Sequence, residues 1–249
     1  MDNKIEICVG SAVAAYEAQC CGADRVELCA ALSEGGLTPS WGEIAMARRL
    51  LTTTKLHVIV RPRKGDFLYS DIERDTILAD IRQARQLEVD GVVIGALTAD
   101  GNIDIDFTRQ MIVAAAGMSI TFHRAFDMCR SQTDALEQLI DLGCHRVLTS
   151  GGYATAEKGA EQLQKLVHQA ANRIIIMPGC GINVANIEHI ARTTVAHEFH
   201  FSASRTAPGK MQYRNPIVSM GGNGSADEYA VSVADCDKIC KIRTILDNL

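Results

Sequence analysis

The chain has 249 residues, of which 47% are apolar and 22% are charged, a balance typical of soluble globular proteins. This composition excludes intrinsically disordered and fibrous proteins, and the length suits one large domain or two small ones. Thirty acidic and 25 basic residues give a net charge of −5, so we expect small-molecule partners and neither nucleic acid nor a membrane surface.

Short apolar, β-branched runs alternate along the chain with segments that show helical spacing and helix caps. The predicted strands cover residues 4–10, 25–30, 55–63, 91–98, 119–127, 146–151, 173–181 and 198–204. The predicted helices cover residues 11–21, 40–52, 70–89, 106–116, 131–142, 155–172, 183–194 and 235–249. Ser40 with Glu43 and Ser70 with Glu73 predict capping boxes for the second and third helices, and Asp106 is the predicted cap of the fourth.

Eight strand–helix units in about 250 residues predict an α/β fold, a single (β/α)8 TIM barrel with a closed sheet of eight parallel strands over residues 1–249. The alternative is an open doubly wound sheet. Such sheets usually carry a glycine fingerprint after the first strand, and residues 9–12 lack one. Residues 205–234, between the eighth strand and the eighth helix, are predicted to be a long segment without regular structure that serves as an oligomer contact or a lid.

The polar residues of the predicted strands fall in phase with the positions that face the interior of a barrel. These residues are Glu6, Cys8, Arg25, Glu27, Cys29, His57, Arg61, Thr121, His123, Glu198, His200, Ser202 and Ser204. An unpaired buried charge costs several kcal/mol, so these groups either satisfy one another or meet a ligand.

Four of these residues are the best candidates for a catalytic or binding site at the C-terminal ends of the strands. They are Glu27, Arg61, His123 and His200. Imidazoles and carboxylates there are able to hold a divalent metal or to act as acid and base, and Arg61 is suited to fix an anionic group. The alternative is a polar core whose members satisfy one another.

Glycine-rich turns follow the sixth and seventh predicted strands. Gly151 ends the sixth strand, and Gly179 and Gly181 lead from the seventh strand into a helix. Backbone N–H groups at such turns attract phosphate and carboxylate, so these glycines are a candidate anion site. Glycine also serves tight turns that bind nothing.

The chain contains nine cysteines, an odd number without the density of a secreted disulfide scaffold, which predicts free thiols in a reducing, cytoplasmic compartment. The N-terminus shows no signal-peptide pattern, and no apolar run approaches the about 20 residues that span a bilayer. Cys236 and Cys240 share a helix face and are predicted to pack, as is Cys20 or Cys21.

Cys8 and Cys29 lie near the ends of adjacent predicted strands, and their parity directs both thiols into the barrel mouth. Two soft thiolates at close range suit Cu(I). Against this interpretation, the chain has no C-x-x-C pair, and buried cysteine more often serves as a small apolar packing residue.

Several longer strings of this sequence resemble the CutC copper-homeostasis family. They are GADRVELC at residues 22–29, EGGLTPS at 34–40, RPRKGDF at 61–67, TFHRAFDM at 121–128, RVLTSG at 146–151, EFH at 198–200 and YRN at 213–215. The similarity covers nearly the whole chain. It departs from the family at Lys64, where many members have glycine, and at Phe201, where a small or polar residue is common.

The resemblance implies a cytoplasmic TIM barrel that forms a homo-oligomer, a dimer or a tetramer, and that handles copper. It also implies Cu(I) binding through the cysteines that match Cys8 and Cys29. The alternative is an enzyme of unassigned reaction on a small anionic metabolite, which the family's polar barrel mouth also resembles.

Overall fold

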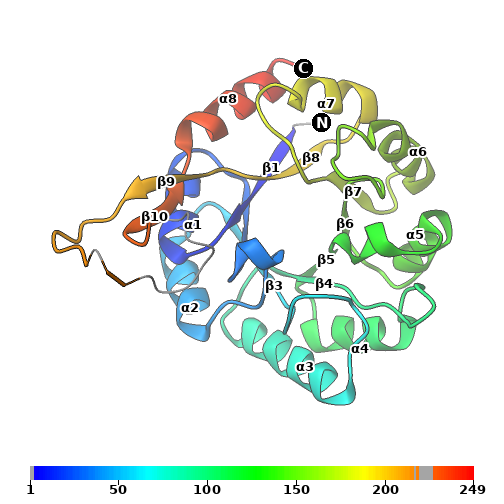
Figure 1. The fold of residues 1–249 in the computed structure, drawn as a ribbon. Helices are drawn as coiled ribbons and strands as arrows, with labels where there is room; N and C mark the ends of the chain where they lie inside the picture. Colours follow the sequence, from blue (N-terminus) through cyan, green and yellow to red (C-terminus); the bar gives the residue numbers. More distant parts are fainter. Residues whose placement is uncertain (1–2, 216, 219–226) are drawn as a thin grey trace.

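The structure is a computed structural model that describes residues 3–215, 217–218 and 227–249. Parallel strands form a ring with helices outside it, and the start of β1 lies on the same side of the barrel as the end of α8 (Figure 1). The barrel strands are β1 (Lys4–Val9), β2 (Arg25–Leu28), β3 (Lys55–Ile59), β4 (Gly91–Ile94), β5 (Ser119–Phe122), β6 (Arg146–Thr149), β7 (Ile175–Pro178) and β8 (Glu198–Ser202). The helices are α1 (Ala12–Cys20), α2 (Trp41–Leu50), α3 (Asp71–Gln86), α4 (Ile105–Ala115), α5 (Gln132–Asp141), α6 (Ala160–Ala170), α7 (Ile187–Thr194) and α8 (Cys236–Asp247).

The predicted TIM barrel is confirmed by the strand order, in which β1 to β7 pair consecutively and β8 pairs with β1. A parallel bridge between Gly179 and His200 joins β7 to β8 and closes the ring. The register of β1 against β8 aligns Glu6 with His200, and that of β1 against β2 aligns Cys8 with Glu27. The strands β1, β2 and β8 therefore bring their polar side chains together, although β8 is far from the other two in sequence. No helix in the described part of the chain is long and apolar enough to cross a bilayer.

Helix caps match the sequence prediction in one case and differ in two. Ser70 and Glu73 form the predicted box, in which each satisfies a backbone N–H of the other. Ser40 accepts from the Glu43 N–H, but the Glu43 carboxylate accepts from the Ala12 N–H at 2.6 Å and so ties α2 to α1. The predicted cap at Asp106 is wrong, since Asp104 caps α4 by accepting from the Phe107 N–H.

The fifth strand is shorter than predicted, because the chain turns at His123. The strand ends at Phe122, and a 3-10 helix η2 (Arg124–Met128) follows. The imidazole of His123 accepts from the Ala125 N–H at 3.1 Å and so caps this turn. This turn leaves the His123 ring at the C-terminal edge of the barrel.

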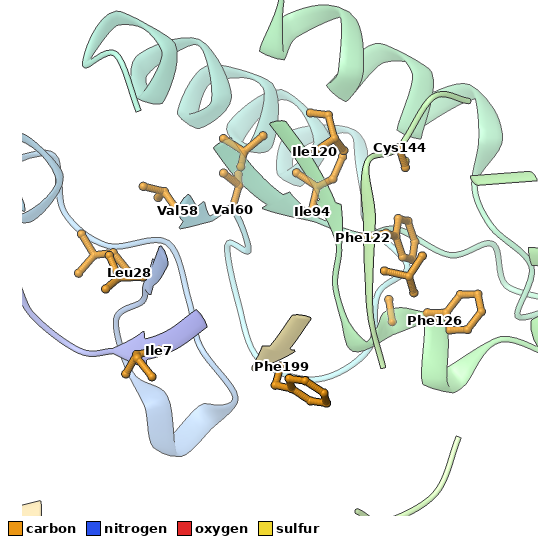
Figure 2. Close-up of a cluster of buried hydrophobic side chains, with 14 of the residues drawn as sticks. Ile7, Leu28, Val58, Val60, Ile94, Ile120, Phe122, Phe126, Cys144 and Phe199 are labelled. Atoms are coloured by element: carbon orange, nitrogen blue, oxygen red, sulfur yellow. The ribbon is translucent and has the colours of Figure 1, made fainter. Parts of the chain in front are cut away.

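The apolar residues of opposite parity form the main core of buried side chains (Figure 2). Ile7, Leu28, Val58, Phe122 and Phe199 are completely buried there. Each of these residues alternates along its strand with a polar residue. Successive side chains of a strand point to opposite faces of the sheet, so the apolar and polar residues lie on different faces. The polar side is therefore the barrel interior.

Residues 205–234 contain more structure than the prediction of an irregular segment allowed. Strands β9 (Ser204–Pro208) and β10 (Ala230–Ala234) pair antiparallel, and this hairpin projects from the barrel beside α1 (Figure 1). The prediction failed because β9 is polar and exposed and lacks an alternating apolar pattern. Within the predicted segment 205–234, residues 216 and 219–226 lie outside the described residues.

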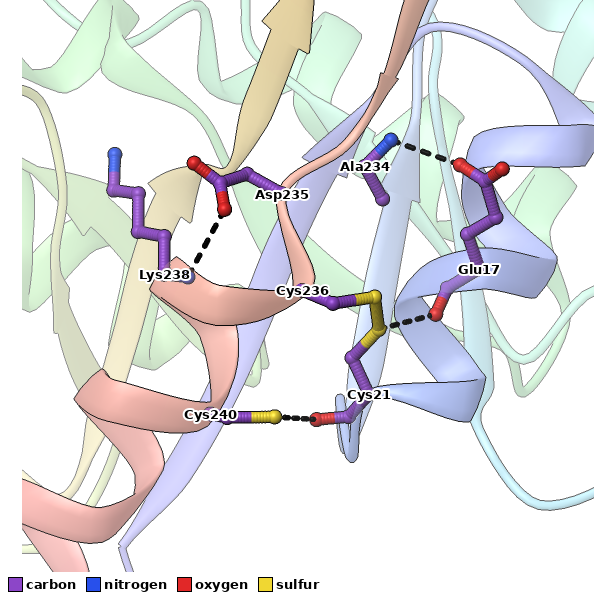
Figure 3. The surroundings of a disulfide bond; sticks show 7 residues. All are labelled: Glu17, Cys21, Ala234, Asp235, Cys236, Lys238 and Cys240. Atoms are coloured by element: carbon purple, nitrogen blue, oxygen red, sulfur yellow. Dashed lines mark hydrogen bonds between the residues drawn. A yellow bond between two sulfur atoms is a disulfide. The ribbon is translucent and has the colours of Figure 1, made fainter.

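A disulfide joins Cys21, after α1, to Cys236, the first residue of α8 (Figure 3). The prediction that all thiols are free, and that these two residues serve packing, is therefore wrong for this pair. The two Cα atoms lie 5.4 Å apart although 215 positions separate them in sequence. Sequence spacing carries no signal for such a pair, because the proximity depends on barrel closure. Cys8, Cys20, Cys29, Cys129, Cys144, Cys180 and Cys240 are free.

Candidate functional site

An ionic network fills the lower part of the barrel interior. The Glu6 carboxylate pairs with Arg25, which also donates to Glu198 at 2.6 Å, and Arg146 donates to the same Glu198 oxygen at 2.6 Å. Burial by itself raises the pKa of Glu6, but the charges of Arg25 and His200 hold that pKa well below its usual range. This layer behaves as the self-satisfied polar core that was one of the sequence-based alternatives.

His200 connects this network to the barrel mouth. Its Nδ1 lies 2.7 Å from Glu6 Oε1, and its Nε2 lies 3.7 Å from Glu27 Oε2. Burial lowers the pKa of His200, but bonds to Cys8 and Glu6 and the charge of Glu27 outweigh it and raise that pKa well above the ordinary value. Burial, and then the negative charge of Cys8, raises the pKa of Glu27. The imidazolium of His200 is thus the cationic centre of the mouth.

Cys8 and Cys29 meet at the C-terminal ends of β1 and β2. Their Sγ atoms lie 3.7 Å apart, and a carboxylate oxygen of Glu27 lies within 4.8 Å of both sulfurs. The hydrogen bond between the thiols lowers the pKa of Cys8 to about 5, with His200 adding to the effect, and raises the pKa of Cys29. The pair therefore holds one thiolate and one thiol at neutral pH.

The four candidate residues and the two cysteines line one cavity of about 320 Å³ at the barrel mouth. The residues are Cys8, Glu27, Cys29, Arg61, His123 and His200. A larger hollow of about 510 Å³ begins near Lys4 and Glu198, at the opposite ends of their strands. We place the chemistry in the smaller cavity, because the polar groups with shifted pKa values converge there.

Arg61 and His123 both lie beside Phe67, a residue that sequence reasoning did not single out. The Arg61 guanidinium carbon lies 5.1 Å from the centre of the Phe67 ring, and the His123 ring centre lies 5.0 Å from it. All three residues line the barrel-mouth cavity. The position of Phe67 in the RPRKGDF string was the only available sequence signal.

The three candidate glycines differ in their surroundings. The Gly151 N–H donates to the Thr149 hydroxyl at 2.9 Å, and the Gly179 N–H donates to the Thr149 carbonyl at 3.0 Å. Gly181 lines the cavity at the mouth. Two of the three backbone donors are therefore used inside the protein.

Comparison with known proteins assigns the chain to a family. A family model described as the CutC family matches residues 3–205. This chain belongs to the CutC family. A family protein CutC from Bacteroides thetaiotaomicron is 54% identical over 236 residues, which cover 95% of each chain. A family protein CutC from Chromobacterium violaceum is 47% identical over 247 residues, 99% of each chain.

The crystal structure of a CutC protein from Streptococcus agalactiae, which carries a copper homeostasis name, is 33% identical with a TM-score of 0.77. The match covers 80% of this chain and 98% of that protein. A thiamine phosphate pyrophosphorylase from Pyrococcus furiosus is 14% identical with a TM-score of 0.61, covering 98% of this chain and 96% of that protein. That second likeness shows a shared barrel fold alone.

Proposed function

We propose that the chain binds Cu(I) through Cys8 and Cys29 at the barrel mouth and serves copper homeostasis in the cytoplasm. The observation that carries this proposal is the 3.7 Å separation of the two sulfur atoms. Metal–thiolate bonds are about 2.3 Å long for zinc, so sulfurs closer than about 4.6 Å reach one ion of similar bond length without backbone movement. Thiolates are the ligands that Cu(I) prefers.

The protonation states of the two thiols suit the binding of a soft cation. The thiolate of Cys8 is available without proton loss, because the pKa of that thiol is lowered to about 5. The Cys29 thiol, whose pKa is raised, releases its proton when the ion binds, so affinity falls as the pH falls. A carboxylate oxygen of Glu27 lies within 4.8 Å of both sulfurs.

The direct test is an anaerobic Cu(I) titration against a competing chelator. We expect about one ion per chain in the wild type and loss of this binding in the Cys8→Ser, Cys29→Ser double variant. Cys144→Ser is the matched control, because Cys144 is a buried free cysteine packed in the main core. Stoichiometric binding that survives the double substitution overturns the proposal.

We also propose a homo-oligomer, a dimer or a tetramer, in which the exposed β9–β10 hairpin makes the contact. The hairpin extends away from the barrel and exposes Val231. Light scattering of the wild type and of a Val231→Lys variant tests this. A wild-type monomer at micromolar concentration contradicts the proposal.

A further inference from the structure

Arg61 is a buried cation without an anionic partner among the residues that the structure describes. Only 7% of the residue is exposed. Its terminal nitrogens donate to the backbone carbonyls of Glu34 and Gly65, each at 3.0 Å, and more weakly to that of Gly36. Its Nε is buried and makes no well-formed hydrogen bond to any described residue, although the Tyr69 hydroxyl is near enough for Arg61 to oppose the rise in the pKa of Tyr69 that burial causes. A guanidinium stays charged in proteins, and burying a charge without a counter-ion costs several kcal/mol.

His123 presents a second donor without an acceptor. Its Nδ1 accepts from the Ala125 N–H, so in the neutral ring the hydrogen is on Nε2. Burial, reinforced by the charge of Arg61, lowers the pKa of His123 to about 3 and keeps the ring neutral. This Nε2 is buried and has no partner in the described part of the chain. Arg61 and His123 both line the barrel-mouth cavity, and each has one N–H group without a hydrogen-bond partner among the described residues.

We infer that a small carboxylic acid binds in the barrel-mouth cavity, with its carboxylate accepting from Arg61 Nε and His123 Nε2 and its body against Phe67. A carboxylate supplies both the missing negative charge and two acceptor oxygens. The cavity of about 320 Å³ lies at the lower end of the sizes that hold small-molecule ligands. The proposed donors share this cavity with the thiol pair, but they are different side chains, so the inference does not depend on copper binding.

The donor set favours a carboxylate over a phosphate. Phosphate sites in barrels are built largely from backbone N–H groups at glycine turns. Here the N–H groups of Ser150 and Gly152 donate to the Asp127 carboxylate, and that of Gly151 donates to Thr149. These three backbone donors are therefore used inside the protein. The two side-chain donors match the two oxygens of a carboxylate.

Thermal unfolding with acetate, malonate and inorganic phosphate, each titrated at constant ionic strength against chloride, tests the inference. We expect acetate or malonate to raise Tm in a saturable way, because a ligand of the native state stabilises it by mass action. Arg61→Met and His123→Phe each remove one donor and keep an apolar body of similar size. Each variant is expected to weaken carboxylate binding about tenfold or more. Arg192→Met, at an exposed arginine of α7, is the matched control.

The outcomes separate the alternatives. Absence of saturable stabilisation in the wild type overturns the inference, as does an affinity that stays within about twofold in both variants. Saturation by phosphate alone overturns the choice of a carboxylate. If Arg61→Met fails to fold by near-ultraviolet circular dichroism, His123→Phe decides, together with the Nε2–H resonance of His123, which the wild-type ligand is expected to shift. The Cys8→Ser, Cys29→Ser variant should keep carboxylate affinity, so failure of the copper proposal leaves this test intact.

Discussion

Glu6 of β1 and His200 of β8 face each other in the register that closes the barrel, and their side chains join at 2.7 Å. This contact links the internally satisfied ionic layer to the open mouth. On one side, the hydrogen bond to Glu6 stabilises the protonated form of His200. On the other side, the charged imidazole interacts with Cys8 and Glu27. The thiolate at the mouth therefore depends on a carboxylate one layer below it.

Substitution of Glu6 should be strongly destabilising. Glu6→Gln leaves Arg25 and His200 with one fewer buried counter-ion, and breaking a buried pair costs about 3–5 kcal/mol. Urea unfolding followed by circular dichroism measures the loss. Glu188→Gln, which breaks an exposed pair with Arg192, should cost less than about 1 kcal/mol. Equal losses in the two variants contradict the assignment of Glu6 as the central counter-ion.

Cys8 should be the reactive thiol of the pair. Because the pKa of Cys8 is about 5 and that of Cys29 is raised, iodoacetamide at pH 6 should modify Cys8 and spare Cys29. His200→Gln removes a hydrogen bond that lowers the pKa of Cys8, so the midpoint of its pH–rate profile should rise in that variant. Peptide mass spectrometry after timed alkylation gives both profiles. A Cys8 midpoint near the ordinary value of about 8.5 in the wild type argues against the pairing.

The disulfide should contribute to stability across the joint between the barrel and its last helix. Cys236→Ser removes the link to Cys21 and should lower the free energy of unfolding by about 2–4 kcal/mol. A reductant should destabilise the wild type by a similar amount and leave the variant unchanged. Cys240→Ser, one helical turn away, is the matched control. A wild type whose unfolding is insensitive to reductant shows that the bond does not form in solution.

Acid should destabilise the protein through its neutral buried histidines. Burial lowers the pKa of His57 to about 3, whereas the unfolded chain titrates near 6.5. Between these values the unfolded state binds more protons, so stability falls as the pH drops through this window, by up to about 1.4 kcal/mol per unit for one histidine. His57→Asn should flatten the slope of unfolding free energy between about pH 6 and 4. An unchanged slope means that His57 binds its proton equally well in the folded and the unfolded protein.

Sequence predicted the barrel well because its signals are local. Strand periodicity, Ser70 with Glu73, and the phase of Glu6, Cys8 and Glu27 are all properties of neighbouring residues. The same alternation brought the cysteines to adjacent strand ends, which the register of β1 and β2 bears out.

The features that sequence did not predict depend on distant contacts. The disulfide and the β9–β10 hairpin require segments that meet only in the folded barrel. Some inward-facing polar residues form ion pairs with one another, and others line the cavity at the barrel mouth. The alternation of polar and apolar residues does not distinguish these two groups. Glu6 and Glu27 have the same phase, yet only Glu6 contacts an arginine among the described residues.

The central claim is that two sulfur atoms hold one copper ion, and X-ray absorption of the protein loaded with one equivalent of Cu(I) tests it most directly. We expect a shell of two sulfur neighbours in the wild type, and no two-sulfur shell in the Cys8→Ser, Cys29→Ser variant. A wild-type spectrum dominated by nitrogen or oxygen neighbours contradicts the account.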